Sequence, residues 1–256
     1  MSRQALFIHG TWLTPLIWGQ FRRRFEACGY SCSAPAWPLL AADPAGQRSQ
    51  PPRATASLGI AAILAHYEGQ IGDLAQPPLL IGHDLGGLLV QLLLDRGLGC
   101  AGIAIAPPAH GGLEGLRGSG PWLLRQALWR GVLHLSPQHF ARTMAQTLTS
   151  ERQAAAYARH IVPAPGRVFF DNALGIGSRI DFGNPDRPPL LLIAAGADRS
   201  VRPAAVAAAY RRHRGSTAVT TFKHFSGYSH WLIAEPGWET IADYCIEWAQ
   251  NQLGRF

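Results

Sequence analysis

Residues 79–87, with the sequence LLIGHDLGG, constrain the fold of this chain more than any other segment. The first three residues are apolar and predict a short buried strand, and residues 85–96 have helical spacing. Between them lies a Gly-x-x-x-Gly turn, and glycine permits the strained backbone that a sharp turn needs. The segment therefore predicts a strand, a sharp turn and a helix, with the side chain of Asp84 at the top of a sheet and beside a helix N-terminus.

The rest of the chain repeats this alternation of short apolar runs, bounded by Pro or Gly, with longer segments of helical spacing. Such an alternation is typical of an α/β fold, in which a parallel sheet is flanked by helices. The predicted strands are residues 5–8, 31–34, 79–81, 102–106, 190–194 and 218–222. The predicted helices include residues 18–28, 58–72, 85–96, 204–213 and 238–253.

One interval, residues 110–186, contains no convincing core strand. A structureless loop of this length would be unusual in a compact domain, so we expect helices there. Residues 1–109 and 187–256 are therefore predicted to form the core domain, and residues 110–186 a helical cap or lid over the sheet.

Asp84 stands at the centre of the turn, where serine is the usual residue of a nucleophile elbow. A carboxylate is ionised and nucleophilic at neutral pH without the help of a base. Its attack on an acyl carbon would give an anhydride with little gain, whereas its attack on an sp3 carbon with a leaving group gives a stable ester. Asp84 is thus predicted to be a nucleophile that forms a covalent alkyl-enzyme ester. The alternative is that Asp84 only caps the following helix, which is a common role for Asp.

Hydrolysis of such an ester needs an activated water and donors for the developing oxyanion. Asp198 follows one predicted strand and His230 follows the last one, which gives the order nucleophile, acid, histidine. We expect His230 to activate water and Asp198 to orient it, although each alone would also fit an ordinary loop residue. The backbone N–H groups of Thr11 and Leu85 are the predicted oxyanion donors.

Four motifs together resemble the α/β-hydrolase superfamily over essentially the whole chain: residues 9–12, 82–87, 196–198 and 229–231. This resemblance implies a mostly parallel sheet of about six strands, without the N-terminal edge hairpin that often opens the fold. An Asp at the elbow preceded by Gly-His is similar to epoxide hydrolases and some haloacid dehalogenases. The resemblance implies a triad of Asp84, His230 and Asp198 and, as the leading activity, hydrolysis of an epoxide to a vicinal diol.

The predicted cap supplies the candidates for activating the substrate. Epoxide hydrolases of this type usually have two cap tyrosines that protonate the epoxide oxygen, whereas only Tyr157 lies clearly in this cap. We expect Tyr157 to act with another donor, His134 or His139. The alternative is that Tyr157 packs a cap helix onto the core.

Two other functions remain open. Dehalogenation would need halide donors, for which Trp12 or Trp129 could serve. The His-Gly-Thr-Trp sequence at residues 9–12 and residues 236–239 look more like serine esterases than like epoxide hydrolases. An esterase or lactonase lineage, in which a Ser-to-Asp change left a binding or non-hydrolytic role, is therefore the second alternative.

Charge and cysteine usage exclude several classes of partner. The net charge of +7 comes almost entirely from scattered arginines, since Lys223 is the only lysine, and no nucleic-acid-binding motif accompanies it. The four cysteines lack zinc-ligand or redox spacing, so we expect reduced thiols, no metal and no cofactor.

No apolar run reaches the length of a membrane span, and the first residues enter a predicted strand at once, which leaves no room for a signal peptide. We therefore expect a cytoplasmic enzyme that acts on a small-molecule substrate, without membrane or nucleic-acid partners. The sequence leaves a homodimer open.

Overall fold

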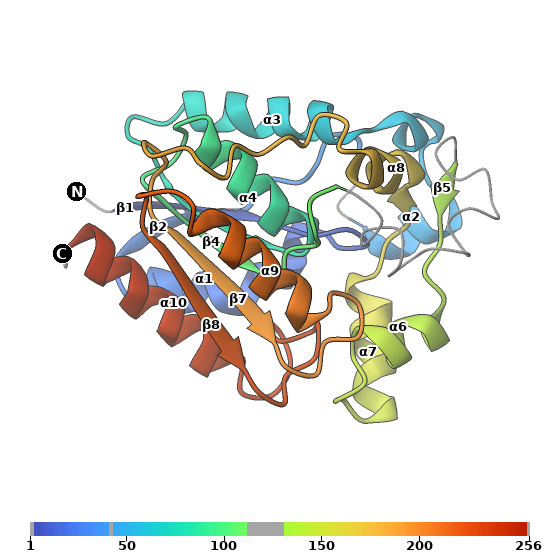
Figure 1. The fold of residues 1–256 in the computed structure, drawn as a ribbon. Coiled ribbons are helices and arrows are strands. Elements are labelled where there is room, and N and C mark those ends of the chain that lie inside the picture. The colour runs from blue at the N-terminus through green and yellow to red at the C-terminus, as the bar shows by residue number, and fades with distance from the viewer. Residues whose placement is uncertain (1–2, 41–42, 112–130, 255–256) are drawn as a thin grey trace.

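The fold is built on one six-stranded parallel sheet with the strand order β2-β1-β3-β4-β7-β8 (Figure 1). A computed structural model describes residues 3–40, 43–111 and 131–254. The sheet confirms the predicted α/β class. Its strands are β1 Arg3–Ile8, β2 Tyr30–Ser33, β3 Leu79–His83, β4 Ala101–Ile105, β7 Leu190–Ala195 and β8 Thr220–Phe225.

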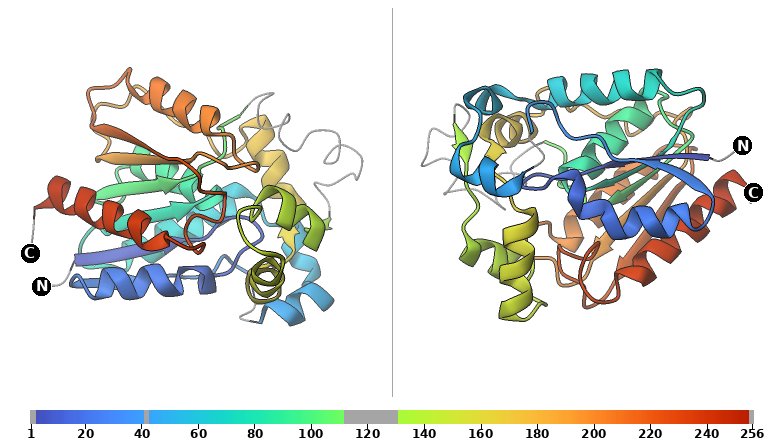
Figure 2. Two further views of the ribbon diagram at one scale, coloured as in Figure 1. Left: turned by 90° about the horizontal axis from the view of Figure 1, so that it is seen from below. Right: turned by 180° about the vertical axis from the view of Figure 1, so that it is seen from behind.

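Helices cover both faces of the sheet, as Figure 2 shows. On one face, α1 (Gly19–Glu26) and α10 (Trp238–Leu253) bury apolar side chains against the sheet in one core cluster. On the other face, α3 (Ile60–Gly72), α4 (Leu85–Asp95) and α9 (Pro203–His213) belong to a second cluster. The central strands β3, β4 and β7 are buried throughout, which explains their continuous apolar sequences.

The largest error in a predicted strand is at β8, which begins and ends later than residues 218–222. This strand pairs only with β7 and is partly exposed, so apolar residues do not mark its ends. The predicted helix at residues 18–28 corresponds to α1, which is preceded by a 3-10 turn, Pro15–Trp18. None of the described helices is long and apolar enough to cross a membrane.

The described part of the insertion is largely helical, as expected. Helix α6 (Pro137–Thr143) is capped by Ser136, whose side chain accepts a hydrogen bond from the His139 N–H. Thr149 caps α7 (Ser150–His160) in the same way, and α8 (Gly166–Leu174) follows. A short antiparallel pair, β5 Val132–Leu133 and β6 Ala164–Pro165, joins the segment before α6 to the segment between α7 and α8.

A segment that the sequence assigns to the core domain also contacts the insertion. It consists of α2 (Pro44–Ser49) and the 3-10 turn Arg53–Ser57. Arg48 donates hydrogen bonds to two carbonyls at the end of α7, those of Ala158 and Ile161, at 3.0 and 2.7 Å. These contacts place the segment beside α7 (Figure 1). The division at residues 110–186 therefore stays a prediction, and the layer over the sheet also includes residues 44–57.

Gly86 allows α4 to approach β1 closely, because a Cβ atom there would lie 2.1 Å from the carbonyl oxygen of Ile8. We expect Gly86→Ala to lower the free energy of unfolding by about 3 kcal/mol, since backbone atoms cannot yield to the added methyl. The control Gly69→Ala, in α3 with no atom within 4 Å of the new Cβ, is expected to raise it by up to about 1 kcal/mol. Urea unfolding followed by circular dichroism measures both changes. Equal effects of the two substitutions would contradict the prediction.

Candidate active site

Asp84 occupies a strained turn between β3 and α4, with φ 53° and ψ −126°. Residues other than glycine rarely adopt these backbone angles, so the hydrogen bonds around Asp84 must hold its backbone in this conformation. The Asp84 N–H donates to the carbonyl of Ile105 at 3.0 Å, and the Asp84 carbonyl accepts from the Gly87 N–H at 2.8 Å. The side chain makes no capping hydrogen bond to α4. The helix-cap interpretation is therefore excluded, and the carboxylate is directed elsewhere.

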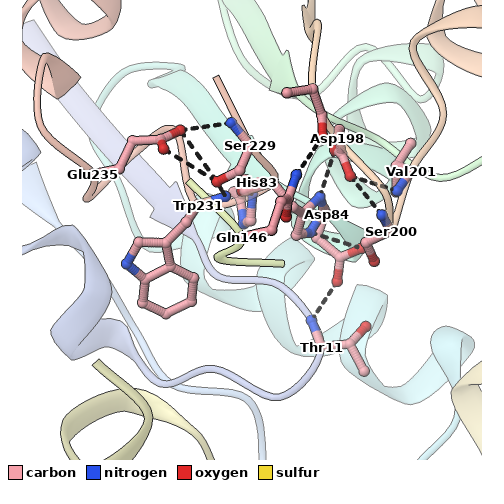
Figure 3. Close-up of polar contacts among 12 residues, drawn as sticks. Thr11, His83, Asp84, Gln146, Asp198, Ser200, Val201, Ser229, Trp231 and Glu235 are labelled. Carbon is pink, nitrogen blue, oxygen red and sulfur yellow. Dashed lines mark hydrogen bonds and ion pairs between the residues drawn. The ribbon is translucent and has the colours of Figure 1, made fainter. Parts of the chain in front are cut away.

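The carboxylate of Asp84 contacts the loop that follows β1. The Thr11 N–H donates to Asp84 Oδ2 at 2.8 Å (Figure 3). Gly10 makes this approach possible, because a Cβ atom there would lie 2.6 Å from the Cβ of Asp84. The N–H of Leu85, the other predicted donor, makes no hydrogen bond to this carboxylate among the described residues. Thr11 is thus in position as a donor, and the role of Leu85 stays a prediction.

His230 lies between two carboxylates. Its Nδ1 is 2.7 Å from Oδ2 of Asp198, and its Nε2 is 3.8 Å from Oδ1 of Asp84. The other oxygen of Asp198 accepts hydrogen bonds from the N–H groups of Ser200 and Val201, at 2.7 and 2.8 Å, which fix its orientation. The structure therefore brings together the three residues predicted as catalytic, at the carboxyl ends of β3, β7 and β8.

The electrostatic environment favours a charged His230. Complete burial by itself lowers the pKa of this imidazole, but the charge of Asp198, its hydrogen bond and the charge of Asp84 outweigh burial, and the net effect is a raised pKa. Because Asp198 accepts from Nδ1, the neutral imidazole presents its lone pair at Nε2, on the side of Asp84. His230 can therefore act as a base toward a water near Asp84.

Two further buried histidines support the loops of the site. Burial lowers the pKa of His83 well below its ordinary value, so this ring is neutral, and its Nε2–H donates to the carbonyl of His230 at 2.9 Å. Burial also lowers the pKa of His9, to about 4. The Nε2 of His9 accepts from the Trp37 N–H at 3.3 Å, and the two rings stack with centroids 4.9 Å apart.

The hydroxyl of Tyr157 points toward another residue of the insertion. Its hydroxyl donates to the carbonyl of Leu135 at 2.6 Å, and its ring packs against Phe140 at a centroid distance of 5.8 Å. His134 and His139 are both exposed. These contacts favour the packing role for Tyr157, and the structure does not bring the three predicted cap donors together at Asp84.

Of the two candidate tryptophans, Trp12 is the one that the structure describes. It follows Thr11 directly, has a left-handed backbone with φ 69° and is 8% exposed. Its ring packs on Phe169 of α8 at a centroid distance of 5.3 Å, so it lies between the donor loop and the insertion. Trp129 lies outside the described residues.

Sequence reasoning missed a buried carboxylate close to His230. Glu235 is 4% exposed and accepts hydrogen bonds from Ser229, the residue before His230, and from Thr147 of the insertion. The six-residue spacing of Ser229 and Glu235 was the available signal. The contact with Thr147 could not be found, because it joins segments 88 residues apart.

Other binding features lie apart from this centre. A surface groove of about 570 Å³ runs between α1, α7 and the loop after β8, and it is lined by Trp231 and Glu235 but not by the three catalytic candidates. Within the part of the chain that the structure describes, no three His, Cys, Asp or Glu side chains form a cluster that could hold a metal ion.

An aspartate at a strand-to-helix turn, a second acid and a histidine at one edge of a parallel sheet have the arrangement of an α/β-hydrolase site. The chain belongs to the alpha/beta hydrolase family, whose sequence model matches residues 5–242. No curated protein sequence matches the chain.

Solved structures agree with this fold. A monoacylglycerol lipase from Paleococcus ferrophilus is 19% identical, with a TM-score of 0.73 over 97% of this chain and 94% of that one. A methylesterase from Arabidopsis is 13% identical, with a TM-score of 0.70 over 97% and 99%. Tomato methylketone synthase I complexed with 2-tridecanone is 13% identical, with a TM-score of 0.74 over 98% and 99%. At these identities the similarity concerns the fold alone.

Proposed function

We propose that this protein is a hydrolase that cleaves its substrate through a covalent ester on Asp84, with epoxides as the leading substrate class. The observation that carries the proposal is the orientation of the Asp84 carboxylate. Oδ2 is held by the Thr11 N–H, while Oδ1 faces His230 at 3.8 Å. One oxygen is thus fixed by an oxyanion donor, and the other is left to attack.

In the first step, Oδ1 of Asp84 attacks an sp3 carbon of the substrate. A bond forms between Oδ1 and that carbon, the bond from the carbon to the epoxide oxygen breaks, and the oxygen keeps the electron pair and takes up a proton from solvent water. The product is an ester whose carbonyl is Cγ=Oδ2. Because Thr11 already donates to Oδ2, its N–H group is in position for the oxyanion of the next step.

In the second step, water attacks Cγ while Nε2 of His230 accepts its proton. The charge that develops on Oδ2 is stabilised by the Thr11 N–H, and Asp198 stabilises the imidazolium through Nδ1. The bond between Cγ and Oδ1 then breaks while the imidazolium of His230 returns the proton to Oδ1, which leaves with the diol. The oxygen from water stays on Asp84, and His230 is neutral again. No cofactor enters either step.

Two alternatives are favoured by specific observations. The hydroxyl of Tyr157 is hydrogen-bonded to the carbonyl of Leu135. Release of a halide needs no proton donor, so this contact supports haloalkane or haloacid substrates with the same nucleophile. The raised pKa of His230 and its approach to Asp84 support a resting ion pair, as expected for a protein of esterase lineage with a binding or non-hydrolytic role. The second alternative predicts no ester on Asp84.

A single turnover in ¹⁸O water tests the proposal. We first screen small epoxides, haloacids and p-nitrophenyl esters, and then react excess enzyme with an accepted alkyl substrate. The label is expected in the Asp84 carboxylate, measured by mass spectrometry of the peptide that contains it, while the first product molecules carry unlabelled oxygen. Label in the product but not in Asp84 would contradict the ester mechanism, as would activity on esters alone.

The pH dependence of turnover follows from the raised pKa of His230. Only the neutral imidazole can accept a proton from water, so ester hydrolysis is expected to fall as the pH drops through this pKa. In Asp198→Asn the pKa of His230 is lowered because a neighbouring negative charge is lost, so the acid limb should move to lower pH while the maximal rate also falls. A profile of kcat against pH for both proteins measures the shift, and an acid limb that stays in place would contradict the assignment of His230.

A further inference from the structure

Glu235 is a buried carboxylate that the two chemical steps do not use. Burying an ionised group is costly unless hydrogen bonds compensate. Glu235 is only 4% exposed, and no cation pairs with it among the residues that the structure describes. Among these residues, the groups that donate hydrogen bonds to its carboxylate are neutral and belong to Ser229 and Thr147. These hydrogen bonds join the carboxylate to the residue before His230 and to the insertion, which suggests a role in positioning the two segments.

The partners of Glu235 hold the backbone on both sides of His230. Oε1 of Glu235 accepts the Ser229 N–H at 2.8 Å, and the Ser229 hydroxyl lies 3.2 Å from each carboxylate oxygen. The same hydroxyl accepts the Trp231 N–H at 3.1 Å. His83 holds the carbonyl of His230 itself. The residues before and after the catalytic base, and its own carbonyl, are therefore fixed by side chains (Figure 3).

The insertion contacts this network at two consecutive residues. The hydroxyl of Thr147 donates to Oε2 of Glu235. The side-chain amide of Gln146 donates to the carbonyl of Ala197, the residue before Asp198. The loop between α6 and α7, of which Figure 3 labels Gln146, thus contacts both the loop that carries His230 and the loop that carries Asp198.

We infer that Glu235 is a positioning residue for His230, and that Gln146 and Thr147 link the insertion to the two loops that carry the base and its acid. We call these three residues the latch. Substitutions in the latch should slow the second step, because hydrolysis of the ester needs His230 in its catalytic position. They should not slow the first step, because attack by Asp84 does not use His230. This assignment to the second step rests on the proposed function.

The kinetic test compares Glu235→Gln and Thr147→Val with matched controls at exposed positions, Glu239→Gln and Thr217→Val. Rapid quenching followed by mass spectrometry gives the rates of ester formation and ester hydrolysis separately. We expect hydrolysis to fall about 10- to 100-fold in the latch variants, since small displacements of a catalytic group have effects of this size. Formation should change by less than about twofold, and Thr147→Ser, which keeps the hydroxyl, should recover the wild-type rate.

A spectroscopic readout makes the inference independent of the chemistry. The proton on Nδ1 of His230, held against Asp198 across 2.7 Å, is expected to give a downfield ¹H NMR signal in the wild type. The signal should shift or broaden in Glu235→Gln and Thr147→Val and stay unchanged in both controls.

The outcomes separate the inference from the proposed function. If the wild type forms no ester, the proposed function fails, and the NMR signal alone decides about the latch. Hydrolysis rates and an NMR signal that both match the wild type would overturn the inference. It would also be overturned if the two steps slowed in parallel with a loss of stability in urea, because that result indicates a merely structural role.

Discussion

Asp84→Asn is expected to lower kcat/KM for an accepted alkyl substrate by about 10⁴-fold or more, the scale seen when a member of a catalytic triad is removed. The amide has nearly the same shape as the carboxylate and can still accept the Thr11 N–H, but it is not nucleophilic at neutral pH. Steady-state kinetics with the substrate identified in the screen measures the loss. The effect should be this large because the proposed reaction begins with attack by this carboxylate.

The matched control is Asp73→Asn, an exposed residue at the end of α3, which changes the net charge equally and should leave kcat/KM unchanged. Asp84→Ser adds a second comparison. It should lose alkyl turnover as fully as Asp84→Asn, while the retained pair of His230 and Asp198 should allow it to hydrolyse p-nitrophenyl esters. Alkyl turnover by Asp84→Asn within tenfold of the wild type would refute the nucleophile assignment.

His230→Gln is expected to stop turnover after the first step and to trap the ester. The carboxylate of Asp84 is retained and can attack, but no base is left to activate water, so steady-state turnover should fall by about 10⁴-fold or more. The enzyme should consume one substrate molecule per active site in a burst and then stall. Mass spectrometry should show the peptide that contains Asp84 heavier by the mass of the bound alkyl group.

The control for this variant is His224→Gln, an exposed histidine on β8, which should turn over normally. Failure of His230→Gln to accumulate any adduct, while its burst of substrate consumption persists, would mean that another base hydrolyses the ester. Absence of both burst and adduct would mean that His230 is needed for the first step, as in the ion-pair alternative.

Much of the core could be predicted from sequence, because its signals are local. Strands β3, β4 and β7 are buried on both faces, so each is a continuous apolar run. The turn at Asp84 is a local pattern as well. Neighbouring backbone atoms leave no room for side chains at Gly82 and Gly86, so both positions are glycine in the sequence. Edge strand β8 was placed too early because its exposed positions weaken the apolar pattern.

The insertion was predictable only as helical. Its sequence indicated helices, but not that residues 44–57 pack with them, since the Arg48 contacts join segments more than 100 residues apart. The expected acid role of Tyr157 assumed a direction for its hydroxyl, and that direction is set by the carbonyl of Leu135. Side-chain direction depends on neighbours that composition and spacing do not specify.

The sequence by itself determined the type and order of the reactive groups at the site: an acid in the elbow, an acid after β7 and a histidine after β8. Parallel strands bring their carboxyl ends to one edge, so this order already implied that the three groups would meet. Only the tertiary structure decided which oxygen of Asp84 is held by Thr11 and which faces His230. It also decided that Glu235 and Thr147 form hydrogen bonds that hold the loop carrying His230. Hydrogen-bond geometry between distant segments depends on distances of a few ångströms, which a linear pattern does not contain.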